Sequence, residues 1–318
     1  MAEVYVFVVC GEKEHIDTLH LSVSYLTKYS QKEIIVLTDS SRNELPIDWK
    51  NTIDIKTPVE LNHHQASIYL KTGIYKFVPK GNLYCYLDTD VLTVSASCDE
   101  IFKEFVEPIR FAADHCSMSR FSPYAVNCGC LEKNEKDRNR FTDSLELLDR
   151  NKELNSFEQR LERAKIKKFY QNLENSFLRK ILLAIRYKLS AKEFKLNEKY
   201  TLNKSSKEWR LPNGEIVKHE LDYTKLEKET GIRLNKWNGA WGNNKNENIF
   251  DTRCNHLQQQ IYDTFSIEIK ETNFQHWNGG VFLFNDSSHS FLGSWHTKTM
   301  KIFGLKGWKT RDQGTLIA

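Results

Sequence analysis

The first 130 residues alternate short apolar runs with longer segments whose apolar residues recur every three to four positions. A continuous apolar run predicts a strand buried on both faces, and the three-to-four period predicts an amphipathic helix. The predicted strands cover residues 4–9, 32–38, 52–55, 82–92 and 109–113, and the predicted helices cover residues 15–29 and 65–78. Strands separated by helices of this length indicate βαβ units. We therefore expect an α/β fold with a mostly parallel, doubly wound central sheet.

The pattern changes near residue 131. From there to about residue 249 the chain is polar, charged and largely helical in its periodicity, and strand patterns return at residues 265–270 and 280–285. The simplest organisation is a single domain over residues 1–318. Its core would be formed by residues 1–130 and 250–318, and a largely helical insertion would occupy residues 131–249.

The charge of the chain is concentrated in one segment. The formal net charge is +4, yet residues 158–195 alone hold eleven Lys and Arg against four Asp and Glu. Proteins that wrap nucleic acid show a broader basic excess, so we expect no nucleic-acid partner. The same segment mixes its cations with apolar residues. It is either a helix lying on an anionic membrane surface or an ordinary amphipathic pair that covers the core.

Hydropathy and cysteine usage indicate a cytoplasmic protein, with the inner face of the membrane as a candidate location. No window reaches the roughly 20 apolar residues of a membrane span, and the first residues lack the pattern of a signal peptide. The seven cysteines are odd in number, which favours reduced thiols. Cys128-Gly-Cys130 is spaced too closely for the usual zinc knuckle and has no matching second pair of cysteines, so a thiolate metal site is not expected.

The sharpest chemical feature is a pair of carboxylates at the end of a predicted strand. The apolar run Tyr84-Cys-Tyr-Leu leads directly into Asp88-Thr-Asp90. Ligands of open α/β sheets bind at the carboxyl ends of the strands. Two carboxylates held close together repel each other, and a hard divalent cation bound to phosphate oxygens would relieve that repulsion.

Two further motifs lie near the end of the chain. His276-Trp-Asn-Gly-Gly precedes an apolar run, and there glycine would let the backbone approach a ligand while Asn278 offers both a donor and an acceptor. Asp312-Gln313 stands at the start of a short helical segment. Its side chains would either bind sugar hydroxyls or cap that segment.

In their order, the three motifs resemble those of the GT-A glycosyltransferases. They are similar to glycosyltransferase family 8, the group of glycogenin and bacterial galactosyltransferases. The resemblance covers roughly residues 1–130 and 265–318 and leaves the insertion without a counterpart. It implies a GT-A fold and a metal-dependent hexosyltransferase. Such an enzyme transfers a sugar from a nucleotide-diphosphate-sugar, with a UDP-sugar favoured, to a glycan or a lipid-linked acceptor.

The resemblance also assigns roles to individual residues. Asp88 and Asp90 match the family's ligands of Mn²⁺ (or Mg²⁺), and His296 is preferred to His289 as a third ligand, although the family's histidine follows the Asp-Gln motif. Asp312 and Gln313 match the residues beside the reacting sugar. The implied donor-binding positions are Val8, Val9, Cys10, Asp39, Lys71, Thr89, Asn278, Gly279 and Gly280.

Several alternatives stay open. Retention of anomeric configuration is favoured by the resemblance, whereas an inverting enzyme would use Asp312 as a base. A nucleotidyltransferase that makes a nucleotide-sugar is a rival, but its usual glycine-rich basic loop is not seen after the first strand. A non-catalytic binding or scaffold protein that has kept the fold is the rival from another class.

Overall fold

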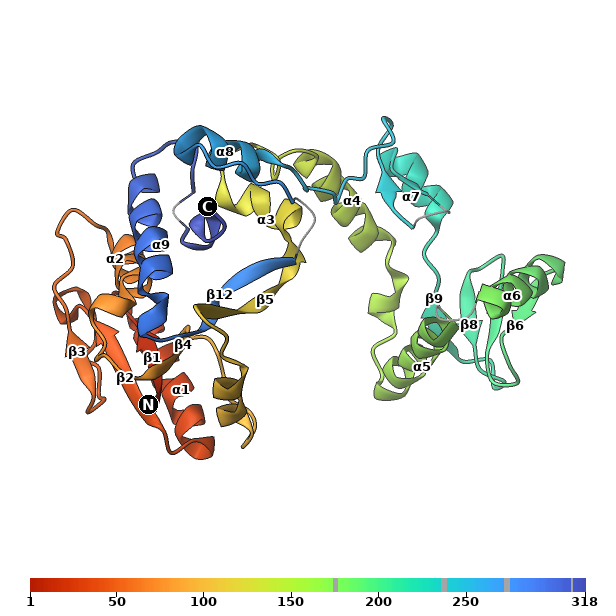
Figure 1. Cartoon of the computed structure of the whole chain (residues 1–318). Helices are drawn as coiled ribbons and strands as arrows, with labels where there is room; N and C mark the ends of the chain where they lie inside the picture. Colours follow the sequence, from red (N-terminus) through yellow and green to blue (C-terminus); the bar gives the residue numbers. More distant parts are fainter. Residues whose placement is uncertain (174–176, 236–238, 272–274, 310) are drawn as a thin grey trace. The chain divides into compact units, whose positions relative to one another are not determined.

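The structure, a computed structural model, describes residues 1–173, 177–235, 239–271, 275–309 and 311–318. These residues form two compact units (Figure 1). Unit 1 joins Met1–Leu131 to Thr252–Ala318, and unit 2 is formed by Glu132–Asp251. Unit 2 is thus inserted into the sequence of unit 1.

Unit 1 is built on a six-stranded sheet of order β3-β2-β1-β4-β12-β5. The strands are β1 (Glu3–Val8), β2 (Glu33–Thr38), β3 (Thr52–Asp54), β4 (Leu83–Leu87), β5 (Ile109–Ser117) and β12 (Gln275–Phe284). The first four strands pair in parallel, and β12 is antiparallel to both of its neighbours, β4 and β5. The predicted α/β fold with a mostly parallel sheet is confirmed, and the arrangement is compatible with a Rossmann-like fold.

Helices cover both faces of this sheet, which explains the continuous apolar runs of its central strands. Val4, Val6 and Val8 point to the face covered by α2 (His63–Thr72) and α9 (His289–Ile302). Tyr5 and Phe7 alternate with them and point to the face covered by α1 (Lys13–Tyr29).

A second core in unit 1 lies between α3 (Met118–Ala125) and α8 (His256–Phe265). Residues 265–270, predicted as a strand, do not form one. Helix α8 ends at Phe265, and Ser266 then takes a left-handed conformation with φ of 58°. The alternating Ile267 and Ile269 pack against the α3–α8 core without joining a sheet, so their pattern reflects burial rather than strand pairing.

Two other boundaries differ from the predictions. Helix α2 ends at Thr72, six residues earlier than predicted, and Gly73 is its C-cap before a 3₁₀ turn over Ile74–Lys76. Strand β12 begins at Gln275, so the Asn278-Gly279-Gly280 motif lies inside the strand rather than before it. The register of β12 against β5 shifts between Asn278 and Phe282, and such irregularities leave backbone groups free to face a ligand.

Unit 2 contains both helices and strands. Its helices are α4 (Glu135–Leu148), α5 (Phe157–Leu173), α6 (Phe177–Leu189) and α7 (Tyr223–Thr230). Its strands are the antiparallel meander β6 (Glu193–Lys195), β7 (Thr201–Asn203), β8 (Glu208–Arg210) and β9 (Ile216–His219), and the pair β10 (Arg233–Leu234) and β11 (Trp241–Gly242). The prediction of a largely helical insertion is therefore incomplete, because it did not include this four-stranded sheet. Strands of two to four residues are too short to show an alternating pattern, although Trp209 and Phe194 on the meander are buried.

None of the helices that the structure describes has the length and apolarity that a membrane-spanning segment needs.

Candidate functional site

A cleft of about 570 Å³ opens at the carboxyl ends of β1 and β4 in unit 1. The N-terminal part of α1, one side of α2 and the C-terminal segment complete its walls. Eight residues predicted from the sequence line it: Val8, Val9, Cys10, Lys71, Asp88, Thr89, Asp90 and Asp312. Strands, helix and chain end therefore bring together side chains that lie far apart in the sequence.

The alternation of side chains along β4 (Leu83–Leu87) explains why Asp88 lies on the side of the sheet covered by α2. Tyr84 and Tyr86 belong to the core beneath α2, whereas Cys85 belongs to the core on the α1 side. Asp88 continues the even-numbered series, and its backbone N–H donates to the carbonyl of Gly280 on β12 at 2.8 Å. Asp88 thus follows directly after β4, is held by the backbone of β12, and lines the cleft.

Lys71 is the centre of a charge cluster in the cleft. Its ammonium lies 2.9 Å from Asp312 Oδ2 and 3.2 Å from Asp88 Oδ1. The side chains of Lys71, Asp312 and Asp88 are 12%, 15% and 36% exposed. Burial disfavours the charged form of Lys71, but attraction to Asp312 and Asp88 outweighs it and raises the pKa of the lysine. Burial opposes ionisation of Asp312 too, yet Lys71 holds the pKa of that carboxyl below its usual value.

The two carboxylates of the Asp-x-Asp motif offer oxygen ligands to the cleft. The hydroxyl of Tyr86 donates to Asp88 Oδ1, and burial beside Asp88 raises the pKa of Tyr86 far above its ordinary value, so the tyrosine stays a neutral donor. Asp90 is exposed on the turn that follows β4. A carboxylate can accept about four contacts, so Asp88 keeps room for a further ligand beside Tyr86 and Lys71. Two oxygen donors in one cleft fit Mg²⁺ or Mn²⁺.

Gly279 and Gly280 allow β12 to lie directly against the charge cluster. A Cβ atom on Gly280 would come within 2.7 Å of Asp88 Oδ2 and 2.9 Å of Asn278 Oδ1, which real structures do not tolerate. A Cβ atom on Gly279 would stand 3.3 Å from Asp312 Oδ2 and 3.6 Å from Lys71 Nζ. The Asn278 amide oxygen accepts from the N–H of Gly280 at 2.6 Å. The glycines are therefore needed for close packing around the carboxylates.

Gln313 lies beside the cluster but is not among the residues that line the cleft. Its amide Nε2 donates to the carbonyl of Trp277 and to Asp114 Oδ2, both at 2.9 Å. Asp114 is a buried carboxylate of β5 that the sequence analysis did not single out. These two bonds hold Gln313 against β12 and β5.

Asp39, predicted among the donor-binding residues, is also absent from the cleft lining. It is buried, and each carboxylate oxygen already accepts two hydrogen bonds. Oδ2 accepts from the backbone and hydroxyl of Thr57, and Oδ1 accepts from those of Ser41. Burial would raise the pKa of Asp39, but these bonds hold it well below the usual range. The structure thus uses Asp39 to join the loops after β2 and β3.

His296 is not brought to the Asp-x-Asp carboxylates. It is buried where α9 meets α2, with Nδ1 2.8 Å from the hydroxyl of Thr72, and burial lowers its pKa to about 4. In the described part of the chain, no group of three metal-ligating side chains includes Asp88 or Asp90. The alternative, His289, lies near Asp286 at the start of α9, with its Nε2 3.7 Å from Oδ1.

Further lining residues were not assigned from the sequence. They include the cationic or titratable side chains of the α1 and α2 ends and of the C-terminal segment: Glu12, His15, His63, His64 and Arg311. His63 and His64 are the first two residues of α2. His63 packs against Gly11, where an added Cβ atom would be 3.1 Å from Nδ1, so the loop after β1 and the start of α2 fit closely together.

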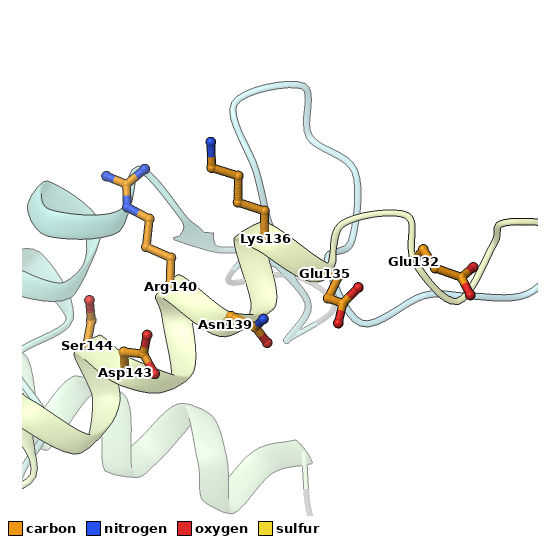
Figure 2. A pocket seen from close by; sticks show the side chains of 7 residues that line it. All are labelled: Glu132, Glu135, Lys136, Asn139, Arg140, Asp143 and Ser144. Carbon is orange, nitrogen blue, oxygen red and sulfur yellow. The ribbon is translucent and has the colours of Figure 1, made fainter.

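Among the hollows that described residues of unit 2 line, two carry clusters of charged side chains. One is open and follows the solvent side of α4, where Lys136 and Arg140 point the same way and acidic residues flank them (Figure 2). Arg140 donates to the carbonyl of Glu229, so this surface is already partly paired within unit 2. The other hollow, of about 900 Å³, has six basic side chains in its lining: Arg160, Arg163, Lys167, Lys204, Lys207 and Lys218. Its lining also contains three tyrosines and a single acid, Glu220.

The sequence matches no protein-family model, and it matches no curated protein.

Proposed function

We propose that unit 1 is a GT-A type, metal-dependent glycosyltransferase of the kind the family 8 resemblance implies, with a nucleotide-diphosphate-sugar as its donor. The observation that carries the proposal is the packing of Lys71 between Asp88 and Asp312, with the glycines of β12 in close approach, inside a cleft at the strand ends. Ligands of open α/β sheets bind in that position. A cleft of about 570 Å³ also accommodates a nucleotide-sized molecule.

Each part of the cleft suits a part of such a donor. Val8, Val9 and Cys10 at the end of β1 form an apolar edge for the base. Lys71 and Arg311 supply positive charge for the diphosphate. Asp88 and Asp90 would hold a divalent cation, which supplies charge neutralisation to the departing diphosphate.

The environment of Asp312 favours retention over inversion. An inverting transferase needs a carboxylate that accepts a proton readily. Asp312 is paired with Lys71 at 2.9 Å and its pKa lies below the ordinary value, so it is a weak base. Gln313, held by Trp277 and Asp114, is a neutral group next to it, and a retaining reaction of the kind that the resemblance implies needs no strong base.

For the acceptor we propose a lipid-linked, phosphate-bearing glycan, on the basis of unit 2. Leu178, Leu182, Ile185 and Leu189 follow each other at helical spacing on α6 and are 73%, 61%, 48% and 80% exposed. The sequence of α6 contains four cations and no acid. An apolar stripe flanked by cations suits the surface of an anionic membrane. The basic hollow of unit 2 would suit the phosphate of the acceptor.

The two rival functions predict different ligands. A nucleotidyltransferase would bind a nucleoside triphosphate together with a sugar phosphate. In the described chain, the loop after β1 and the first turn of α1 offer Glu12 and His15 to the cleft rather than a glycine-rich basic loop. A scaffold protein would bind its partner without any need for a metal at Asp88 and Asp90.

A thermal-shift series with nucleoside diphosphates and nucleotide-sugars, each with and without Mn²⁺, tests the donor site. At a ligand concentration about 100 times Kd, binding to the folded state adds about 2.7 kcal/mol of stability. We expect one nucleotide to raise Tm only when Mn²⁺ is present, and Asp88→Asn/Asp90→Asn to abolish that rise. Stabilisation that survives in the double variant would exclude the metal-dependent donor site.

A further inference from the structure

Three cysteines and one histidine of unit 1 converge at a place remote in sequence from the Asp-x-Asp motif. They are Cys128, Cys130, Cys254 and His256, and their four candidate ligand atoms all lie within 4.8 Å of one another. None of them lines the cleft. They come from two short segments 126 positions apart, Cys128-Gly-Cys130 and Cys254-Asn-His256.

Two of the distances within the group match edges of a zinc tetrahedron. With Zn–S of about 2.3 Å and Zn–N of about 2.0 Å, tetrahedral geometry requires S···S of about 3.8 Å and S···N of about 3.5 Å. Cys128 Sγ and Cys254 Sγ are 3.8 Å apart, and Cys130 Sγ and His256 Nδ1 are 3.5 Å apart. A disulfide would need about 2.05 Å between two sulfurs, so the thiols are free.

The fold fixes both segments before any ion is bound. The side-chain amide of Asn127 donates to the carbonyls of Lys306 and Trp308, which anchors the chain next to Cys128. Gly129 then takes a left-handed φ of 70°, a conformation that glycine adopts without strain and that turns the chain between the two thiols. The N–H of Cys254 donates to the carbonyl of Ser119 at 3.0 Å, which ties the second segment to α3.

A neighbouring hydroxyl supports a thiolate at Cys254. Ser122 Oγ lies 3.1 Å from Cys254 Sγ and accepts the N–H of Leu257 at 2.9 Å. Because the oxygen already accepts from Leu257, its own proton is available to the sulfur. Outer hydrogen bonds of this kind orient metal ligands and tune their basicity.

We propose that Cys128, Cys130, Cys254 and His256 bind one Zn²⁺ in a closed, structural site. Three thiolates and an imidazole in tetrahedral array select zinc over Mg²⁺ or Mn²⁺, which take oxygen ligands. Four protein ligands leave no open position, so the ion stabilises rather than catalyses. The site follows from residues outside the cleft and stands independently of the proposed function.

The position of the site indicates which parts of unit 1 the ion would connect. Cys130 precedes the last residue of the first part of unit 1, Leu131, and Cys254 lies shortly after Thr252, where unit 1 resumes. Zinc would cross-link the two segments of unit 1 between which unit 2 is inserted. A metal that closes a long loop removes conformational entropy from the unfolded chain, so the gain should be large here.

The sequence pattern does not reveal this site, because Cys128-Gly-Cys130 has no matching second pair of cysteines. The second pair is Cys254 with His256, and a Cys-x-His pair next to a helix start has no distinctive spacing. Only the approach of α8 to the end of α3 reveals that the two pairs face each other.

Metal analysis of the purified full-length chain tests the proposal. We expect one zinc per chain by mass spectrometry of the elements, and loss of that zinc in Cys254→Ser and in Cys130→Ser. Cys98→Ser is the matched control, because Cys98 is also a partly buried free thiol of unit 1 but lies outside the group; it should keep its zinc.

A measurement on the wild type keeps the test decisive if the variants fail to fold. After removal of zinc and addition of Co²⁺, we expect the intense visible absorption of tetrahedral cobalt with a thiolate charge-transfer band. A weak octahedral cobalt spectrum, a Cys128–Cys254 disulfide in place of metal, or full zinc retention by a soluble Cys254→Ser variant would each overturn the proposal.

Discussion

The Lys71–Asp312 pair gives a quantitative test of the charge cluster. Replacing Lys71 by Met removes the ammonium and leaves Asp312, 15% exposed, without its partner at 2.9 Å. Removing one partner of a buried ion pair costs about 3–5 kcal/mol, whereas an exposed pair is worth about 0–1 kcal/mol. Both side chains keep a small exposed fraction, and Asp88 is 36% exposed, so we expect about 3 kcal/mol of lost stability in unit 1.

A double-mutant cycle separates the pair from other effects of the substitution. Asp312→Asn removes the uncompensated charge, so Lys71→Met/Asp312→Asn should lose about 2 kcal/mol less than the sum of the two single variants. Lys80→Met, an exposed lysine of unit 1, should change stability by less than about 0.5 kcal/mol.

The assay must report on unit 1, because a chain with two compact units need not unfold in a single transition. Cys85 is fully buried on β4, so its modification by a thiol reagent during a urea series, read by mass spectrometry, measures the opening of the unit 1 core. A Lys71→Met variant as stable as the wild type, or single effects that simply add, would refute the assignment of a strongly coupled pair.

Further predictions concern the glycines, the buried histidines and the exposed helix. Gly280→Ala, whose Cβ atom would meet Asp88 Oδ2 at 2.7 Å, should weaken Mn²⁺-dependent nucleotide binding in calorimetry by about tenfold, whereas Gly304→Ala, with open space around it, should not. Burial lowers the pKa of His296 and His276 to about 4, whereas the same side chains in the unfolded chain bind a proton near pH 6.5. Protons therefore favour the unfolded chain, and the free energy of unfolding measured in urea should fall by about 3 kcal/mol per histidine as the pH is lowered from about 6.5 to about 4. His296→Gln should remove about half of this loss, and an unchanged pH profile would contradict the assignment. Leu178→Ser/Leu182→Ser should abolish sedimentation with anionic vesicles, and Leu147→Ser, 84% exposed on α4, should keep it; equal binding by both variants would exclude α6 as the contact.

The α/β core could be predicted from the sequence because its strands are buried on both faces. Residues 4–9 and 34–37 are apolar at every position, so the sequence identifies these strands without knowledge of their partners. The carboxylates after β4 could be placed at the cleft because the carboxyl ends of parallel strands meet at one edge of the sheet.

The remaining features depend on contacts that a linear pattern does not carry. The meander of unit 2 has strands of three or four residues, too short for an alternating pattern. Asp39 was assigned by its place after β2, but the hydrogen bonds of Ser41 and Thr57 use its oxygens within the fold. The positions of Arg311 and His63 in the cleft depend on how distant segments fold together.

In the proposed function, Asp88 and Asp90 serve a metal-dependent transfer from a nucleotide-sugar. The most direct measurement is the release of nucleoside diphosphate from a panel of nucleotide-sugars with Mn²⁺, by the wild type and by Asp88→Asn/Asp90→Asn. Removing a group that stabilises developing charge typically costs about 100-fold or more in rate. We predict release that requires Mn²⁺ and falls by about that factor in the folded double variant. Release at the same rate in both proteins would contradict this role of Asp88 and Asp90, and so would a wild type that releases nothing from any donor in the panel.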